Sequence, residues 1–310
     1  MQIIDKLPKP LHNVLSFCAN CIRHSPRFAW LYANRFKGLT KDQIKYLLIN
    51  AGNNVDFTNP KTFTQKLQWL KVYYQDSLLT QCADKVMVRE YVKSSIGEQY
   101  LIPLLGTYDK TDQIPFADLP CQFVLKVNWG SGQNIICKDK QSLNVKKAIR
   151  QINKWMEPTS NHYYDFFEWC YKNIQPKILA EHYIEQLDGF LIDYKIHVFN
   201  GEPILLQFID RWESHKETIY YIPDWTQTEL HFTYEKLNRY FKKDATIEHI
   251  LNLSRKLAKP FPYVRVDFYN INGKIYFGEL TFYPGGGMLN MPQYWAKKLG
   301  DFLILPESKQ

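Results

Sequence analysis

The chain has 310 residues, of which 45% are hydrophobic and 23% are charged. This ordinary globular composition argues against a disordered chain, and the length predicts two or three packed units. The formal net charge of +8 suits an anionic partner such as a nucleotide, an acidic polysaccharide or a membrane face. The chain has no long run of like charges and no nucleic-acid-recognition signature, which argues against a nucleic-acid partner.

The amino-terminal region and the cysteines predict a cytoplasmic protein. Residues 1–10 are too broken by charge and proline for a signal peptide, and no apolar stretch approaches the about 18 residues of a membrane span. The 6 cysteines have scattered spacings that indicate reduced thiols rather than a disulfide framework. Residues 11–37 are predicted as a basic amphipathic helical segment, which packs on the domain or, alternatively, lies peripherally on an anionic membrane surface.

The pattern along the chain changes from helices to strands and predicts an α+β fold. A strand at Phe123–Asn128 leads into the glycine-rich loop 129–132. From Lys177 onward strands dominate, with hairpin turns at Asn200-Gly201 and Asn272-Gly273. The expected helices cover residues 40–50, 60–74, 84–93, 145–171 with a break near Pro158, 246–258 and 291–299.

Two neighbouring strands near the carboxyl end bring acidic residues together. In the first strand Arg265 and Asp267 share one face, and in the second Glu279 is expected to share its face with Phe277 and Thr281. Two carboxylates on adjacent strands suit Mg²⁺, which prefers a few carboxylates together with phosphate oxygens. Arg265 beside them suits a transferring phosphoryl group or a developing oxyanion.

The turn between these strands tests the metal interpretation. A two-residue turn at Asn272-Gly273 by itself pairs Asp267 with Gly278 and sends Glu279 to the opposite face. A three-residue loop or a β-bulge instead brings Asp267 opposite Glu279. The metal site therefore requires an odd-length loop or a bulge. Without either, these residues form the solvated face of an ordinary hairpin.

Other segments carry residues that suit phosphate groups. Lys126 lies on a strand just before the loop Trp129–Gln133, which can fold over phosphates although it is neither a Walker loop nor a nucleophile elbow. Asp84 is expected to cap the helix that Lys85 opens. The glycines at 285–287 allow main-chain N–H groups to approach an anion closely. A surface lysine and a flexible turn are the structural alternatives.

The segment Ile178–Glu185 carries the groups that a nucleoside needs. Its main chain offers edges for adenine, and Glu181 and Glu185 offer carboxylates for the ribose hydroxyls. The alternative is an edge strand with a solvated acidic stripe.

Six segments, taken in order, resemble the ATP-grasp superfamily, and more narrowly its TupA-like branch, which is associated with teichuronopeptide and surface-polysaccharide biosynthesis. The combination is specific, although no single motif is. The resemblance covers about residues 55–300. The segments that carry it are Ala83–Val92, Phe123–Gly132, Asp193–Lys195, Phe199–Gly201, Val264–Phe268 and Phe277–Phe282.

The resemblance implies an ATP-grasp fold, in which two α+β subdomains hold ATP, together with a helical amino-terminal region. The implied division is residues 1–80 for the helical region, 81–185 for the smaller subdomain and 186–310 for the larger one with the Mg²⁺ site. ATP and Mg²⁺ are the implied cofactors.

The resemblance also implies the roles of individual residues. Arg265, Lys126, Asp267 and Glu279 would be catalytic, and Asp267, Glu279 and Thr281 would bind the metal. Two positions depart from the family pattern: Thr281 stands where Asn is usual, and Trp129 where a smaller residue or His is expected. The implied ATP-binding residues are Lys85, Lys126, Gly130, Ser131, Gly132, Glu181, Ile184, Glu185, Lys195 and Gly286.

The implied reaction is an ATP-dependent ligation. A carboxylate is phosphorylated to an acyl phosphate, which an amine attacks to give an amide, ADP and phosphate. The expected acceptor is a uronic acid of a capsular or cell-wall polysaccharide or its precursor, and the donor is an amino acid or small amine. A glycosyltransferase or carbohydrate kinase is the first alternative, and a non-catalytic ATP-binding module is the second.

Overall fold

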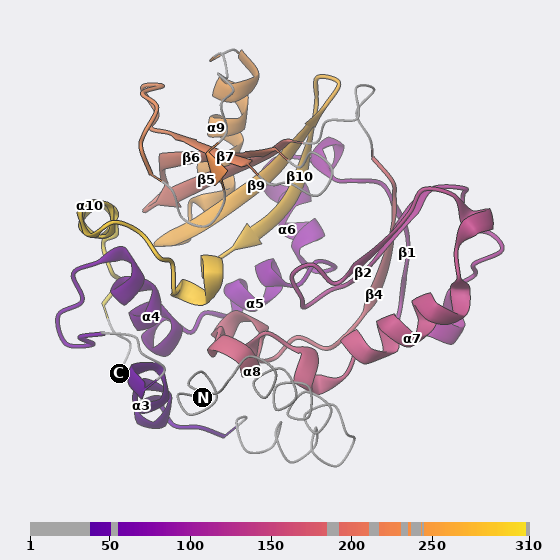
Figure 1. Cartoon of the computed structure of the whole chain (residues 1–310), viewed down its shortest axis with the longest axis horizontal. Coiled ribbons are helices and arrows are strands. Elements are labelled where there is room, and N and C mark those ends of the chain that lie inside the picture. Colours follow the sequence, from indigo (N-terminus) through magenta and orange to yellow (C-terminus); the bar gives the residue numbers. More distant parts are fainter. Residues whose placement is uncertain are drawn as a thin grey trace.

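The protein is an α+β molecule built on two β-sheets, as the sequence predicts. A computed structural model describes residues 38–50, 55–184, 192–210, 217–230, 235–236, 243 and 245–307. Within these residues, one sheet has four strands and the other has six. Figure 1 shows the two sheets on opposite sides of the molecule, with short helices between them.

Helices occupy the start of the described chain: α3 (Lys41–Asn50), α4 (Phe63–Tyr73), α5 (Ser77–Ala83) and α6 (Val88–Ser95). The helix predicted at 60–74 begins at Phe63 because a capping box forms before it. The Thr62 hydroxyl accepts from the N–H of Gln65 at 3.3 Å, and the Gln65 side chain accepts from the N–H of Thr62 at 3.2 Å.

Asp84 caps a turn rather than the helix that was expected to start there, which corrects the prediction. Its Oδ1 atom accepts hydrogen bonds from the N–H groups of Val86 (2.7 Å) and Met87 (3.2 Å), and α6 begins only at Val88. Its Oδ2 atom accepts from the side chain of Asn128 at 2.9 Å. Asp84 therefore ties this turn to the start of the glycine-rich loop.

The four-stranded sheet consists of β1 (Leu104–Tyr108), β4 (Ile178–His182), β2 (Phe123–Val127) and β3 (Asn134–Cys137), in that spatial order. Along β2, Phe123, Leu125 and Val127 are fully buried, whereas Lys126 lies on the opposite face. The helix α7 (Val145–Trp155) packs against β2.

The helix predicted over 145–171 is longer than the one observed. After α7 the chain continues only in short pieces, because Pro158 cannot donate a helical hydrogen bond. These pieces are η5 (Pro158–Ser160), α8 (Tyr163–Phe166) and η6 (Trp169–Tyr171). Three further 3-10 turns are η2 (Glu98–Tyr100), η3 (Thr111–Gln113) and η4 (Lys140–Ser142).

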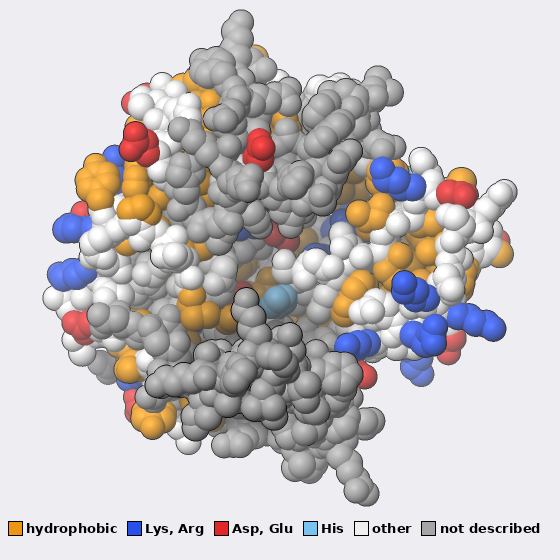
Figure 2. Space-filling view, viewed as in Figure 1, with side chains coloured by type: hydrophobic (Ala, Val, Ile, Leu, Met, Phe, Trp, Pro, Cys, Tyr) orange, Lys and Arg blue, Asp and Glu red, His pale blue; other side chains and the backbone are white. Residues whose placement is uncertain are grey.

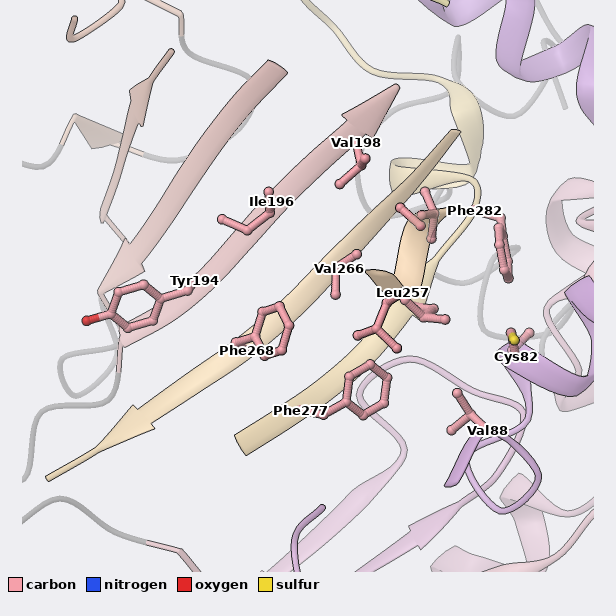
Figure 3. Close-up of a cluster of buried hydrophobic side chains, with 14 of the residues drawn as sticks. Cys82, Val88, Tyr194, Ile196, Val198, Leu257, Val266, Phe268, Phe277 and Phe282 are labelled. Carbon is pink, nitrogen blue, oxygen red and sulfur yellow. The ribbon is translucent and has the colours of Figure 1, made fainter. Parts of the chain in front are cut away.

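The six-stranded sheet consists of β10 (Lys274–Thr281), β9 (Tyr263–Ile271), β5 (Ile192–Phe199), β6 (Glu202–Asp210), β7 (Glu217–Tyr221) and β8 (Glu235–Lys236). The helix α9 (Ala245–Ala258) packs on it. Figure 3 shows Val266 and Phe268 of β9 pointing toward Leu257 of α9, with Val88 of α6 beside them. One hydrophobic core thus joins the sheet, α9 and the α5–α6 segment.

The carboxyl-terminal helix α10 (Gln293–Phe302) follows the 3-10 turn η7 (Pro284–Gly287) and packs on α4. Lys66 of α4 donates to the carbonyl oxygens of Gly300 (2.8 Å) and Leu303 (2.7 Å). These bonds tie the end of α10, where main-chain oxygens lack the usual helical partners, to α4.

Several expectations concern residues that the structure does not describe. The basic segment 11–37, and the membrane association that rests on it, lie outside the described residues. No described helix is long and apolar enough to cross a membrane. The described cysteines, Cys82, Cys121, Cys137 and Cys170, are free thiols. The structure adds α5, β1 and β3, which the sequence pattern did not predict.

Replacing Gly300 by alanine should destabilise the contact between α10 and α4. A Cβ atom at Gly300 would lie 2.2 Å from the carbonyl oxygen of Lys61 and 2.9 Å from the amide nitrogen of Phe63. We expect a loss of about 1–3 kcal/mol in the free energy of unfolding, measured by urea denaturation. Gly38→Ala, whose Cβ atom would meet no atom of the described residues within 4 Å, is the control and should change the free energy of unfolding by less than about 0.5 kcal/mol. Equal effects of the two substitutions would contradict this account.

Candidate active site

A cavity of about 330 Å³ lies between the two sheets, within the range of about 300–1,000 Å³ that is usual for ligand pockets. Figure 2 shows the molecule hollowed between its two halves. Most of the residues predicted from the sequence are on the cavity wall. They are Lys85, Lys126, Gly130, Ser131, Gly132, Glu181, Ile184, Lys195, Asp267 and Glu279.

The β9–β10 hairpin contains the bulge that the metal interpretation requires. Its turn is the two-residue one, Asn272-Gly273, with φ values of 51° and 84°, as a type I′ turn needs. The register of this turn holds as far as Phe277 and then shifts, so that Glu279 pairs with Asp267. Gly278 is the extra residue. The predicted pairing of the two carboxylates is therefore confirmed, and a bulge rather than a longer loop produces it.

The same bulge makes one prediction wrong, because Phe277 does not share a face with Glu279. Phe277 packs edge-on against Phe268, with ring centroids 6.4 Å apart, and Figure 3 shows both rings in the core. Thr281 does lie with Glu279, since its hydroxyl donates to Glu279 Oε1 at 3.1 Å. The extra residue reverses the alternation of side chains only once, between Phe277 and Glu279.

Arg265 and Lys195 neutralise Asp267 at the cavity wall. Arg265 donates from Nε to Oδ1 and from Nη2 to Oδ2, both at 2.7 Å. Lys195, which lies opposite Asp267 on β5, also donates to Oδ2. Burial raises the pKa of the Asp267 carboxyl, but the two cations outweigh it and hold the pKa below its ordinary value. Arg265 Nη2 also reaches Glu279 Oε1 at 3.1 Å, so one guanidinium links both carboxylates.

The chemistry of these side chains fits a hard divalent cation. Asp267 and Glu279 present carboxylate oxygens to the cavity, and Mg²⁺ commonly takes one or two carboxylates together with phosphate oxygens. These are the residues that would hold it. The described residues contain no group of three or more His, Cys, Asp or Glu side chains that could hold a metal ion. Thr281 is not on the cavity wall, and its role as a ligand stays a prediction.

On the opposite wall, Glu181 lies between two cations. Lys126 donates to its Oε2 at 2.6 Å, and Arg89 donates to its Oε1 at 3.1 Å. Lys85 donates to the carbonyl of Gly130 in the glycine-rich loop. The pKa of Lys85 lies below its ordinary value, because the effect of burial outweighs the opposing charge of Glu279 across the cavity. The two lysines thus place positive charge beside the loop, where an anionic ligand would be held.

The glycine-rich loop joins β2 to β3 and is anchored by hydrogen bonds to the segment between the end of α7 and α8. The buried Trp129 donates its indole N–H to the carbonyl of Trp155, at the end of α7, at 2.9 Å. The N–H of Ser131 donates to His162 Nε2 at 2.9 Å. Trp129, which departs from the family pattern, is therefore an anchor of the loop rather than part of the cavity wall.

Residues 65–304 match the family model described as TupA-like ATPgrasp. The chain belongs to the TupA-like ATP-grasp family. Its two α+β halves around one cavity are those of an ATP-grasp fold, preceded by helices. No protein with a curated description matches the chain significantly.

Solved ligase structures are also similar to this ATP-grasp chain. The D-alanine–D-alanine ligase of Bacillus anthracis, complexed with ATP, is 17% identical over 66% of this chain and 57% of its own, with a TM-score of 0.39. The D-alanine–D-alanine ligase of Helicobacter pylori is 14% identical over 78% of this chain and 67% of its own, with a TM-score of 0.42. N5-carboxyaminoimidazole synthase from Aspergillus clavatus is 12% identical over 69% of this chain and 46% of its own, with a TM-score of 0.38. The chain thus spans 57% of the first of these proteins and 46% of the last.

Arg265, like Thr281, contacts the paired carboxylates without lining the cavity itself. Two further residues of the ATP-grasp pattern, Gly286 and Glu185, are not seen at the cavity either. Gly286 is covered by Phe166, whose Cγ would lie 2.8 Å from a Cβ atom placed there. The N–H of Gly286 donates to the carbonyl of Tyr283 at 2.9 Å, and its own carbonyl accepts from Lys71. Glu185 lies outside the described residues. Contacts of Gly286 and Glu185 with ATP therefore stay predictions.

Several residues on the cavity wall were not predicted as site residues from the sequence, among them the polar side chains of Arg89, Tyr171 and Asp193. Arg89 and Asp193 lie inside the segments that carry the ATP-grasp resemblance, and this is the signal that could have found them. Tyr171 has no local signal, because η6 brings it to the cavity. Burial, together with nearby negative charge that includes Glu279, raises the pKa of Tyr171 well above its ordinary value. Its hydroxyl thus stays protonated at neutral pH.

Removing the carboxylate of Asp267 should destabilise the protein far more than removing that of Glu279. The Asp267 side chain is 5% exposed and that of Glu279 is 37% exposed. Asp267→Asn removes the buried carboxylate that Arg265 and Lys195 share and leaves Lys195 only the longer pair with Asp193 at 3.8 Å. We expect a loss of about 3–5 kcal/mol in the free energy of unfolding. Glu279→Gln should cost less than about 1 kcal/mol. Guanidinium denaturation without nucleotide measures both, and equal losses would show that Asp267 is not the neutralising centre.

Proposed function

We propose that this protein is an ATP-dependent carboxylate–amine ligase. The observation that carries the proposal is the pairing of Asp267 with Glu279 across the bulge, facing Lys85 and Lys126 over one cavity. Carboxylates for Mg²⁺ on one wall and lysines for phosphate groups on the other are the two halves of a Mg·ATP site. ATP supplies the phosphoryl group that activates a carboxylate as an acyl phosphate, and an amine then converts this to an amide.

We assign to Arg265 the role of stabilising the negative charge that develops in such a reaction. Its guanidinium is fixed by three hydrogen bonds of 2.7–3.1 Å to Asp267 and Glu279. A donor held in this way costs no reorganisation when charge appears beside it. Lys195 shares Asp267 with Arg265 and lies on the same cavity wall. Positioning and charge neutralisation carry phosphoryl transfer, so these residues suffice without a covalent nucleophile.

The loop Trp129–Gln133 is placed to exclude water from the reacting groups. Gly130, Ser131 and Gly132 line the cavity, and the hydrogen bonds of Trp129 and Ser131 anchor the loop. Keeping water away protects an acyl phosphate from hydrolysis before the amine attacks.

The proposed acceptor is a uronic-acid carboxylate in a surface polysaccharide or its precursor, and the proposed donor is an amino acid or small amine. Membership of the TupA-like family supports this, because the segments quoted from the sequence resemble a branch associated with surface-polysaccharide biosynthesis. The formal net charge of +8 also favours an acidic acceptor.

A non-catalytic ATP-binding module is the second candidate. The observation that favours it is the position of Thr281, which is not on the cavity wall and engages Glu279 and Arg265 instead. Such a module would bind Mg·ATP without turning it over.

Phosphate release by the purified full chain tests the ligase proposal. With Mg·ATP, polygalacturonate and a panel of amines, formation of ADP and phosphate should require both co-substrates. Glu279→Gln should lower kcat by at least about 100-fold, as loss of one charge-stabilising group does. The control is Glu202→Gln, which removes an exposed pair with Arg255 of the same 3.1 Å length and should leave kcat unchanged.

The products also separate the alternatives. Sugar transfer from a nucleotide-sugar without phosphate release would show a glycosyltransferase, and ADP without free phosphate would show a kinase. ATP binding without turnover under any of these conditions would favour the non-catalytic module.

A further inference from the structure

The helix α7 carries an unusual concentration of positive charge. Its sequence, VKKAIRQINKW, contains four basic residues and no acidic one. Lys146, Lys147, Arg150 and Lys154 are all exposed, whereas the opposite side of the helix buries Ala148 and Ile152. Figure 2 shows Lys and Arg side chains gathered over the part of the molecule where α7 lies in Figure 1.

Three of these cations form a straight row. Lys146, Arg150 and Lys154 are spaced four residues apart, so they follow one ridge of the helix at intervals of about 6 Å. None of the three makes an ion pair with any described residue, while exposed lysines elsewhere do, as Lys93 does with Glu98 (3.0 Å) and Lys297 with Asp301 (2.8 Å). The charge of the row is therefore not balanced by the described part of the protein.

The row leads to the loop that borders the cavity. Lys154 is followed directly by Trp155, whose carbonyl accepts the indole N–H of Trp129 at 2.9 Å. A second link lies one turn further along, where Gln133 at the end of the loop donates to the carbonyl of Ser160 at 3.1 Å. The carboxyl end of α7 therefore lies beside the glycine-rich loop, whose residues 130–132 line the cavity.

We propose that the row Lys146–Arg150–Lys154 is a secondary binding site for a linear polycarboxylate, which presents its reacting carboxylate to the cavity. This inference rests on the proposed ligase function and adds that the acceptor is a polymer rather than a single sugar. A straight row of charges complements a chain of regularly spaced carboxylates, whereas a compact anion would need cations that converge on one point.

The chemistry of α7 favours a polysaccharide over the other large anions. Helices that bind membrane surfaces insert large apolar side chains, but none of the exposed large hydrophobic residues of the described chain lies on α7. Single-stranded nucleic acid is held by exposed aromatic platforms between the cations. The one aromatic residue of α7, Trp155, is half-buried at the end of the helix.

The test compares two triple variants of the full chain that remove the same net charge. One is Lys146→Gln, Arg150→Gln and Lys154→Gln. The other, the control, is Lys256→Gln, Lys259→Gln and Lys274→Gln, which removes exposed lysines from the six-stranded half. The first measurement is the Kd for polygalacturonate without ATP, by titration calorimetry at two salt concentrations. The second is the KM for polygalacturonate and for monomeric galacturonate in the phosphate-release assay.

The α7 variant should raise both the Kd and the KM for the polymer by about tenfold, the effect expected for three exposed charge contacts. The KM for the monomer and for ATP should stay unchanged, as should kcat. The difference between wild type and variant in polymer binding should shrink at high salt, because exposed charges are screened. The control variant should bind the polymer as wild type does.

Equal weakening by the two triple variants would overturn the proposal, because it would show an effect of net charge alone. Tighter α7-dependent binding to duplex or single-stranded DNA, or to vesicles containing phosphatidylserine, would overturn it in favour of another polyanion. A chain that turns over no substrate at all but binds polygalacturonate through α7 would contradict the ligase function while supporting the polymer site.

Discussion

The bulge at Gly278 is the constraint on which the site depends. Side chains alternate along a strand with a period of two, so the two-residue turn at Asn272-Gly273 would by itself send Glu279 away from Asp267. One extra residue in β10 restores the pair without changing the turn. The hairpin therefore keeps the turn type that suits the twist of its strands, and still places both carboxylates on the cavity side.

Charge pairing explains how these carboxylates can face one cavity. Asp267 and Glu279 share the guanidinium of Arg265, and Lys195 adds a second cation at Asp267. Glu181, on the opposite wall, is paired with two cations in the same way. A buried carboxylate without a partner would be strongly destabilising. Each wall is thus preorganised, and on the proposed function Mg·ATP would exchange contacts between charged groups rather than create charge in an apolar space.

Local patterns predicted most of the fold and the order of the site residues, and contacts between distant segments account for the rest. The alternation in β9 and the need for an odd residue in the hairpin followed from the sequence, but a bulge and a longer loop satisfy that need equally. Only the observed pairing of the two strands shows that a bulge at Gly278, and not a longer loop, supplies the extra residue. Phe166 covers Gly286, and Tyr171 lines the cavity. Both contacts come from chain segments far from the motifs, and no local sequence signal predicts them.

The central claim is that Asp267 and Glu279 together hold the metal of a bound nucleotide. Anomalous scattering from crystals grown with Mn²⁺ and a non-hydrolysable ATP analogue tests it most directly. The account predicts a Mn²⁺ peak within coordination distance of both carboxylates, between them and the phosphate oxygens, with Glu279 still paired to Asp267 across the bulge. A peak bound only by residues of the opposite wall, or a hairpin in which Asp267 pairs with Gly278, would contradict it.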